Sequence, residues 1–129
     1  MSISYKGNFI QGEFRIPTDA NGEWTVKSPA DLTDAVGVIR YSYRSVDEAV
    51  SAARMAFPAW KKTTFAERSK LLEKYKDQLK ARQEDLARMM AREVGKPLWE
   101  AQQEVVTMIN KVDISLKGTE KMIILSISL

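Results

Sequence analysis

The hydrophobic residues of this chain follow two different patterns, one before residue 45 and one after it. Residues 1–44 hold short apolar or alternating segments separated by Gly and Pro, which is typical of short strands and turns. Two such segments flank Gln11-Gly12, and this arrangement predicts a β-hairpin. The predicted strands are residues 8–10, 13–16, 24–28 and 36–43.

From Ser45 onward the apolar residues recur at helical spacing. Ser45 and Glu48 have the spacing of a capping box, in which each side chain bonds the backbone amide of the other residue, so we predict that a helix begins here. Pro58 should bend or end this helix, because it lacks an amide donor and crowds the preceding turn. The predicted buried stripe is Val46, Ala49, Val50, Ala53, Ala56, Phe57 and Trp60.

A second capping-box pattern, Thr64 with Glu67, opens a longer helical region. The polar segment 80–85 predicts a junction between two helices. Gly95 is suited to a left-handed helix end and Pro97 to the first turn of the next helix, with Lys96 compensating the helix dipole. The predicted core residues are Leu71, Leu72, Tyr75, Leu79, Leu86, Met89 and Met90, then Leu98, Ala101, Val105, Met108, Ile109, Val112 and Leu116.

The last eleven residues depart from this helical pattern. Met122 to Leu129 carry no side-chain charge and are rich in Ile and Leu, so we expect a β-prone segment that needs a partner strand or groove. The sequence therefore predicts an α+β fragment: a β-hairpin and short strands (1–44), three to four α-helices (45–118) and an apolar tail (119–129), together one incomplete domain.

Composition excludes most common catalytic centres. The chain has 129 residues, a net charge of +3 and 44% hydrophobic residues, but neither Cys nor His. It therefore lacks a thiolate nucleophile, disulfides, and the residue best suited to proton transfer near neutral pH. No apolar run is long enough to span a membrane, and the first residues do not resemble a signal peptide, so we expect a cytoplasmic protein without a membrane partner.

The remaining candidate motifs each have a simpler structural interpretation. Gly7 and Gly12 have the outer spacing of a phosphate-binding loop, but Glu13-Phe14 follow where Lys and Ser or Thr are required, which favours a hairpin turn. The pairs Glu84/Asp85 and Glu100/Glu104 place carboxylates close together, yet helix surfaces commonly carry such pairs, so we favour solvated charges over a metal or catalytic site.

Residues 61–82 hold eight basic and three acidic residues. Binding to nucleic acid would need this charge on one exposed face, whereas Leu71, Leu72 and Leu79 interleave it at core spacing. We therefore favour an amphipathic helix and expect no nucleic-acid partner, with a small basic nucleic-acid binder as the least favoured alternative.

The order of several short segments resembles the beginning of an NAD(P)-dependent aldehyde dehydrogenase, over about residues 8–117. The segments are residues 8–14, 28–30, 46–50, 52–54, 56–60, 67–68 and Glu93-Val94-Gly95-Lys96-Pro97. Those that look most like the succinylglutamate-semialdehyde dehydrogenases of arginine catabolism are residues 65–68, 95–101, 104–105, 108–111, 114–115 and 117.

The resemblance implies the periphery of a cofactor-binding domain. It also implies a parent enzyme, several times longer, that oxidises an aldehyde through a covalent adduct on a Cys and passes hydride to NAD(P). None of the family's catalytic, cofactor-binding or metal-binding residues can be carried over to this chain, so we expect no cofactor here.

Two functional hypotheses follow. The leading one is a truncated N-terminal portion of such an enzyme, inactive by itself, produced by an early stop, an altered reading frame or deliberate truncation. The alternative is a self-associating structural or interaction module, a homo-oligomer formed through uncovered apolar surface that includes Ile123, Ile124, Leu125, Ile127 and Leu129.

Overall fold

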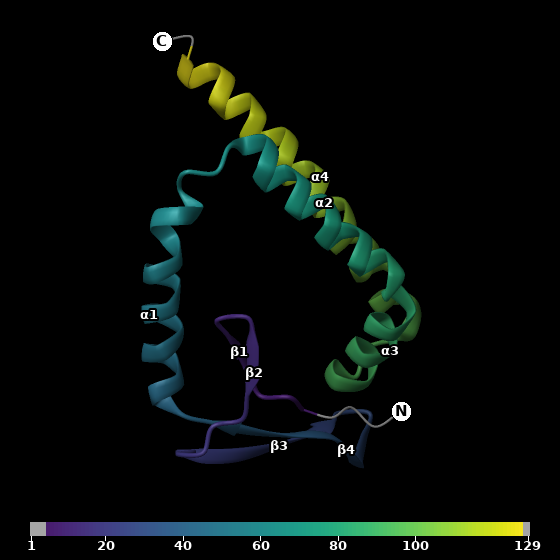
Figure 1. The fold of residues 1–129 in the computed structure, drawn as a ribbon. Helices are drawn as coiled ribbons and strands as arrows, with labels where there is room; N and C mark the ends of the chain where they lie inside the picture. Colours follow the sequence, from purple (N-terminus) through teal and green to yellow (C-terminus); the bar gives the residue numbers. More distant parts are fainter. Residues whose placement is uncertain (1–4, 128–129) are drawn as a thin grey trace. The chain divides into compact units, whose positions relative to one another are not determined.

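The computed structural model describes the backbone of residues 5–127 and the side chains of residues 5–122. Within these residues the strands come first and the helices follow, as the sequence predicts (Figure 1): β1 (Asn8–Ile10), β2 (Glu13–Arg15), β3 (Gly22–Ser28), β4 (Asp31–Tyr41), α1 (Tyr43–Trp60), α2 (Phe65–Ala81), α3 (Gln83–Val94) and α4 (Leu98–Ile127). The described residues form two compact units. The first comprises the chain up to Thr63 together with Arg92–Gly95, and the second comprises Thr64–Ala91 and the chain from Lys96.

The predicted hairpin is confirmed. β1 and β2 pair antiparallel, with Phe9 opposite Phe14 and their ring centroids 4.9 Å apart. Gln11 and Gly12 both have positive φ, 56° and 84°, which a two-residue hairpin turn of the primed type requires. Gln11 is the one described non-Gly residue with positive φ, and the tight turn imposes this backbone conformation on it.

The second strand pair is longer than its sequence pattern suggested. β3 and β4 pair antiparallel from Gly22–Tyr41 to Ser28–Asp31, with an irregular register near Lys27. Pairing extends to Asp31 because Pro29-Ala30 make the reversal at the end of β3, so both strands continue to that turn.

The start of α1 differs from the prediction. The helix begins at Tyr43 with Ser42 as N-cap, and the predicted capping box at Ser45 is not formed at the helix end. The side chain of Asn21 accepts a hydrogen bond from the Tyr43 amide (2.8 Å) and so supplies the cap from another loop. Pro58 lies in the last turn, and the helix ends two residues later at Trp60, in agreement with the predicted position.

The apolar stripe of α1 is not buried, contrary to expectation. None of the 18 residues of α1 is buried, and Val46, Val50, Phe57 and Trp60 all count among the exposed large hydrophobic side chains. The stripe has the right helical spacing, but the main element packed against this helix within the first unit is the short strand β1.

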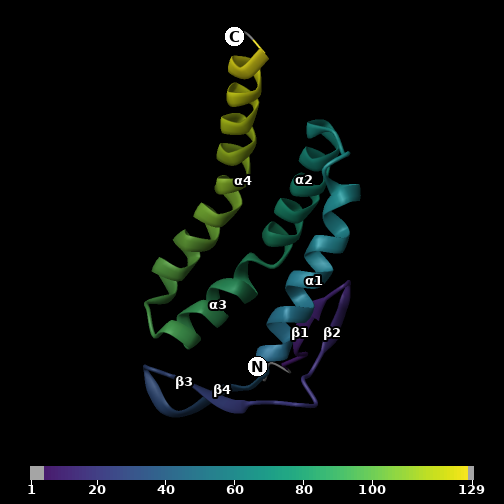
Figure 2. The ribbon, with the colours of Figure 1, turned by 90° about the vertical axis from the view of Figure 1, so that its left-hand side faces the viewer.

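The starts of α2, α3 and α4 and the ends of α2 and α3 lie where the sequence indicated. The Thr64–Glu67 capping box is formed, with the Glu67 amide donating to the Thr64 hydroxyl (3.2 Å) and the Thr64 amide donating to the Glu67 carboxylate (2.7 Å). Arg82 separates α2 from α3, and Gly95 ends the following segment with φ of 74°. Figure 2 shows α3 continuing from α2 after this break.

A small core holds the second unit together. It consists of Leu79, Ala87, Ala101, Val105 and Ile109, with Leu86, Met90 and Ala91 packed against it. Several residues predicted for this core are exposed instead: Leu71, Leu72, Tyr75, Leu98 and Met108. The reason is geometric. Because α2 and α4 pack side by side, each helix buries only the part of its apolar face that is turned toward the other helix.

The C-terminal segment is helical, in contrast to the predicted β-prone tail. α4 continues without interruption through Gly118 to Ile127. Extending an existing helix costs no new nucleation, whereas an isolated strand has no hydrogen-bonding partner, so helix is the favoured conformation here. The side chains of Ile123, Ile124, Leu125 and Ile127, and all of Leu129, lie outside the described residues.

Candidate functional site

The polar residues that the sequence singled out form ion pairs rather than a reactive cluster. Within residues 5–127, no group of three or more Asp and Glu side chains is arranged to hold a metal ion. The Glu100/Glu104 pair is the clearest case. The Lys96 ammonium lies 3.6 Å from Glu100 and hydrogen-bonds Glu104 at the start of α4.

Lys96 thus has a different role from the predicted one. Its ammonium bonds side chains of α4, where the sequence suggested compensation of the preceding helix dipole. The hydrogen bond to Glu104 raises the pKa of Lys96 above its ordinary value, although partial burial acts in the opposite direction. The Lys96 ammonium therefore pairs with the carboxylates of Glu100 and Glu104, where a metal ion would otherwise have to bind.

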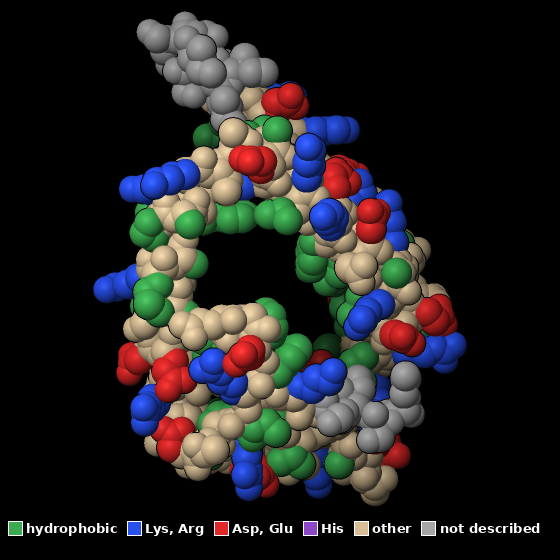
Figure 3. All heavy atoms as spheres, in the orientation of Figure 1, with side chains coloured by type: hydrophobic (Ala, Val, Ile, Leu, Met, Phe, Trp, Pro, Cys, Tyr) green, Lys and Arg blue, Asp and Glu red, His purple; other side chains and the backbone are tan. Residues whose placement is uncertain are grey.

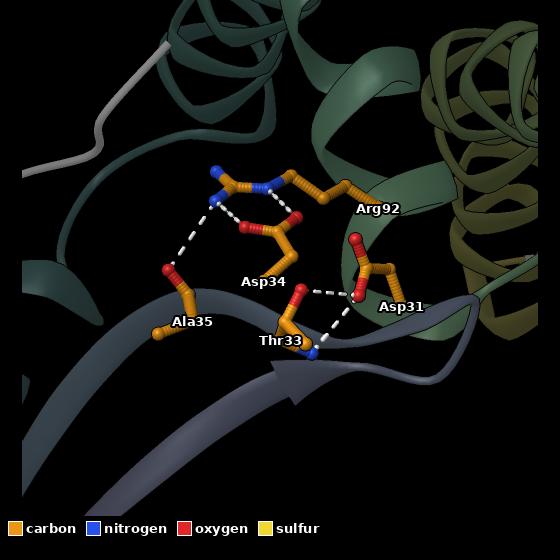
Figure 4. Close-up of polar contacts among 5 residues, drawn as sticks. All are labelled: Asp31, Thr33, Asp34, Ala35 and Arg92. Carbon is orange, nitrogen blue, oxygen red and sulfur yellow. Dashed lines mark hydrogen bonds and ion pairs between the residues drawn. The ribbon is translucent and has the colours of Figure 1, made fainter.

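Figure 4 shows a polar cluster in the first unit that the sequence did not indicate. The Arg92 guanidinium donates to both carboxylate oxygens of Asp34 on β4, with Nε 2.6 Å from Oδ2, and Nη2 also donates to the Ala35 carbonyl (3.3 Å). Both side chains are about two-thirds buried. This two-pronged geometry is the strong form of an Arg–carboxylate pair.

The charges in this cluster stabilise one another. The hydrogen bond from Arg92 lowers the pKa of Asp34 and correspondingly raises the pKa of Arg92. Nearby, Asp31 accepts hydrogen bonds from the Thr33 hydroxyl (2.6 Å) and amide (2.9 Å), and these bonds lower the pKa of Asp31. Because both carboxylates already accept hydrogen bonds and stay ionised near neutral pH, neither is suited to general acid catalysis.

A third ion pair links α2 with α4 inside the second unit. Lys76 bonds Asp113 (2.6 Å) and Glu73 (3.2 Å), and its side chain is 14% exposed. The hydrogen bond lowers the pKa of Asp113 and raises that of Lys76. Acidic and basic side chains are interspersed over these helices, as Figure 3 shows, so the basic residues of segment 61–82 share their surface with carboxylates.

The described residues do not form a dinucleotide site of the Rossmann type. Gly7 precedes β1 and Gly12 lies in the turn between β1 and β2, with Glu13 already in a strand, so the two glycines do not form a phosphate-binding loop before a helix. Both sheets in residues 5–127 are two-stranded and antiparallel. The Rossmann type of nucleotide site needs a parallel strand followed by a glycine turn and a helix.

Each unit has hollows on its surface. One hollow, with a volume of about 530 Å³, is lined in part by Asp19, Arg44 and Glu48, and the Arg44 guanidinium pairs with both carboxylates. A second hollow of about 300 Å³ lies between the hairpin and the Ala-rich side of α1. A third, between α2 and α4, has a volume of about 270 Å³ and is lined by Leu72, Tyr75, Met108, Lys111, Val112 and Ser115.

No helix within the described residues is both long enough and apolar enough to cross a membrane.

Comparison with known proteins decides the family. Residues 16–124 match the aldehyde dehydrogenase family. The chain belongs to this family. The resemblance found in the sequence is thereby confirmed, and the α+β fold is shared with solved aldehyde dehydrogenases.

Two curated relatives show what share of a complete aldehyde dehydrogenase this chain spans. It is 44% identical over 111 residues to N-succinylglutamate 5-semialdehyde dehydrogenase of Chromobacterium violaceum, covering 85% of this chain and 22% of that enzyme. It is 51% identical over 120 residues to the enzyme of the same name from Salmonella typhi, covering 92% of this chain and 23% of that enzyme. The chain thus spans less than a quarter of the length of these relatives.

Solved aldehyde dehydrogenases contain the same fold as part of a longer chain. The Bartonella henselae enzyme superposes with a TM-score of 0.81 at 28% identity, covering 88% of this chain and 24% of that one. The NAD-dependent enzyme from Sinorhizobium meliloti gives a TM-score of 0.78 at 32% identity, covering 84% and 22%.

Proposed function

We propose that this chain forms the N-terminal portion of an aldehyde dehydrogenase that oxidises N-succinylglutamate 5-semialdehyde, or a similar aldehyde, with NAD(P) as hydride acceptor. The identity to curated relatives carries this proposal. It reaches 44% and 51% with enzymes named for that substrate, compared with 28% and 32% for the solved aldehyde dehydrogenases described above. A role in arginine catabolism and a cytoplasmic location belong to the same proposal.

We further propose that residues 1–129 alone have no dehydrogenase activity. Covalent aldehyde oxidation needs a nucleophile that forms and releases an adduct, and a bound hydride acceptor. The sequence has no Cys and no His, and the described residues lack a dinucleotide-binding arrangement. The activity therefore requires residues that this chain does not contain.

A chimera tests both statements. Residues 8–117 replace the matching segment of the Chromobacterium violaceum enzyme, and NAD(P)H production is measured with N-succinylglutamate 5-semialdehyde. We expect the chimera to assemble and turn over like its parent, while residues 1–129 alone show no turnover. An inactive or misassembled chimera would contradict the first statement, and turnover by the 129-residue chain would contradict the second.

A second candidate function, self-association, is favoured by the uncovered apolar surface. Val46, Met55 and Phe57 on α1 are each more than half exposed, and no residue of that helix is buried. Surfaces of this kind commonly mark protein contacts. We propose that copies of the isolated chain associate through such surface, with the C-terminal apolar residues included. Sedimentation velocity should show a mass that rises with concentration, and a monomer at the highest concentration would refute it.

A further inference from the structure

Asn21 and Gly22 form a chemically labile pair at the start of β3. When glycine follows asparagine, its backbone nitrogen can attack the side-chain carbonyl carbon of the asparagine, because no Cβ hinders the approach. The other two asparagines of the sequence, Asn8 and Asn110, precede residues with large side chains. Asn21 is therefore the asparagine at which this attack is least hindered.

The structure gives each member of the pair a local role. Gly22 lies against Tyr41, and a Cβ at residue 22 would collide with the Tyr41 ring. The Asn21 amide donates to the Tyr41 carbonyl (2.8 Å), and the Asn21 side-chain oxygen Oδ1 accepts the hydrogen bond from the Tyr43 amide (2.8 Å) that caps α1. Packing thus favours glycine at one position, and capping favours asparagine at the other.

The surroundings of the pair permit the reaction. Asn21 is exposed, so water reaches it. Gly22 and Tyr41 form the last pair of the β3–β4 ladder, and the end of a ladder opens more readily than its interior. The capping bond uses Oδ1, whereas Nδ2 is the atom that must leave. A hydrogen bond to Oδ1 also stabilises the negative charge that develops on this oxygen during attack.

The start of α1 is suited to a negative charge. In the described part of the chain, Ser42, the N-cap residue, makes no side-chain capping bond, and the first turn of α1 carries no acidic residue. Anions are stabilised near a helix N-terminus, where the N–H groups and the helix dipole give a partial positive charge. A carboxylate at residue 21 should therefore cap α1 more strongly than the present amide does.

We propose that Asn21 is a self-modification site, at which the chain converts the neutral cap of α1 into a carboxylate cap. The Gly22 nitrogen bonds Cγ of Asn21 and gives up its proton, the bond from Cγ to Nδ2 breaks, and Nδ2 leaves as ammonia. Water is the co-reactant, and it opens the resulting succinimide ring at either carbonyl. The products are aspartate and isoaspartate. No group is oxidised or reduced, and the formal net charge of +3 falls by one.

The two products differ at the cap. Aspartate keeps the original backbone and offers a carboxylate oxygen to the Tyr43 amide. Isoaspartate takes the backbone through the former side chain, which lengthens it by a methylene group and displaces the pair of Gly22 with Tyr41. Aspartate should therefore stabilise the start of α1, and isoaspartate should destabilise it. This inference is independent of the proposed dehydrogenase function.

The first test follows the reaction in the intact 129-residue chain. Trypsin places the three asparagines in separate peptides, residues 7–15, 16–27 and 93–111. After incubation of the folded chain at mildly alkaline pH, mass spectrometry should show deamidation of peptide 16–27 several times faster than of the other two. Asn21→Gln should abolish this product, because the larger ring closes slowly. Equal rates in the three peptides, or an unchanged peptide 16–27, overturn the proposal.

The second test measures the cap itself. Asn21→Asp reproduces the aspartate product, and Ala20→Asp is the matched control, since it adds the same charge at the preceding exposed residue. We expect Asn21→Asp to lower the equilibrium constant of unfolding by roughly two- to fivefold in urea titrations, and Ala20→Asp to change it less.

Amide exchange reports directly on the capping bond. In NMR measurements the Tyr43 amide should exchange more slowly in the original chain and in Asn21→Asp than in Asn21→Ala. If Asn21→Asp is no more stable than Ala20→Asp, the carboxylate does not improve the cap and the proposal is wrong. If Asn21→Ala leaves the exchange of Tyr43 unchanged, residue 21 does not cap α1 and the proposal is equally wrong.

Discussion

Two glycines of this chain should respond in opposite directions to the same substitution. Gly95 has φ of 74°, and a Cβ there would lie 3.0 Å from the Pro29 Cβ and 3.3 Å from its Cγ. Gly118 lies inside α4, and a Cβ there would meet nothing within 4 Å. Gly95→Ala and Gly118→Ala therefore add the same methyl group in two different backbone conformations.

The magnitudes follow from backbone strain and helix propensity. An L-residue in the left-handed region costs roughly 1–2 kcal/mol, so Gly95→Ala should lower the free energy of unfolding by at least about that amount, with the Pro29 contact adding to it. In a helix interior Ala is favoured over Gly by about 1 kcal/mol, so Gly118→Ala should raise the free energy of unfolding by about this amount. The two variants should differ by roughly 2–3 kcal/mol.

Urea unfolding followed by circular dichroism measures both effects at one fixed chain concentration. Gly95→Asn provides a further comparison, because Asn carries the same Cβ but adopts positive φ more easily. We expect Gly95→Asn to lie between the original chain and Gly95→Ala. If Gly95→Ala is neutral or stabilising, the left-handed conformation at Gly95 is wrong. If Asn costs as much as Ala, crowding at Pro29 rather than backbone strain sets the cost.

Three further predictions concern the second unit. Thr64→Ala removes the hydroxyl of the capping box and should lower the free energy of unfolding by about 1 kcal/mol in urea titrations, and no change would refute the capping role. Val105→Ala should cost about 2 kcal/mol because Val105 is fully buried, whereas Val106→Ala, at a half-buried neighbour, should cost distinctly less by the same measurement. Asp113→Asn should lower the urea midpoint at neutral pH but not in strong acid. The bond from Lys76 depresses the pKa of Asp113, so its contribution is complete above the ordinary value near 3.8 and is lost as the pH falls through the folded value. Equal effects at both pH values would contradict that assignment.

Local sequence signals predicted most of the element boundaries. The Thr64 capping box, the positive φ at Gly95 and the hairpin at Gln11-Gly12 are confirmed because each depends on residues close together in the chain. The start of α1 was misplaced by two residues because the cap comes from Asn21, a residue 22 positions upstream of the amide that it bonds. A cap that comes from a distant loop cannot be recognised in the sequence near the start of the helix.

Burial was predicted less well than helical spacing. The stripe of α1 has the correct period, but period shows which residues share a face and not whether another element covers that face. The Asp34–Arg92 pair was missed for a related reason. Its residues are 58 positions apart, and nothing in either local segment indicates that they meet.

The exposed apolar stripe of α1 fits the membership of this chain in a family of much longer proteins. Most of the stability of a helix in a protein comes from packing of its apolar face, and α1 has no buried residue. Its stripe of Val46, Val50 and Phe57 is nevertheless as regular as that of the well-packed α4. Since such spacing stabilises a helix only when the stripe is covered, the sequence of α1 fits a larger aldehyde dehydrogenase fold better than a free 129-residue unit. Backbone amide exchange should therefore be faster in α1 than around Val105 of α4, and it should slow in the chimera, where the rest of the fold is present.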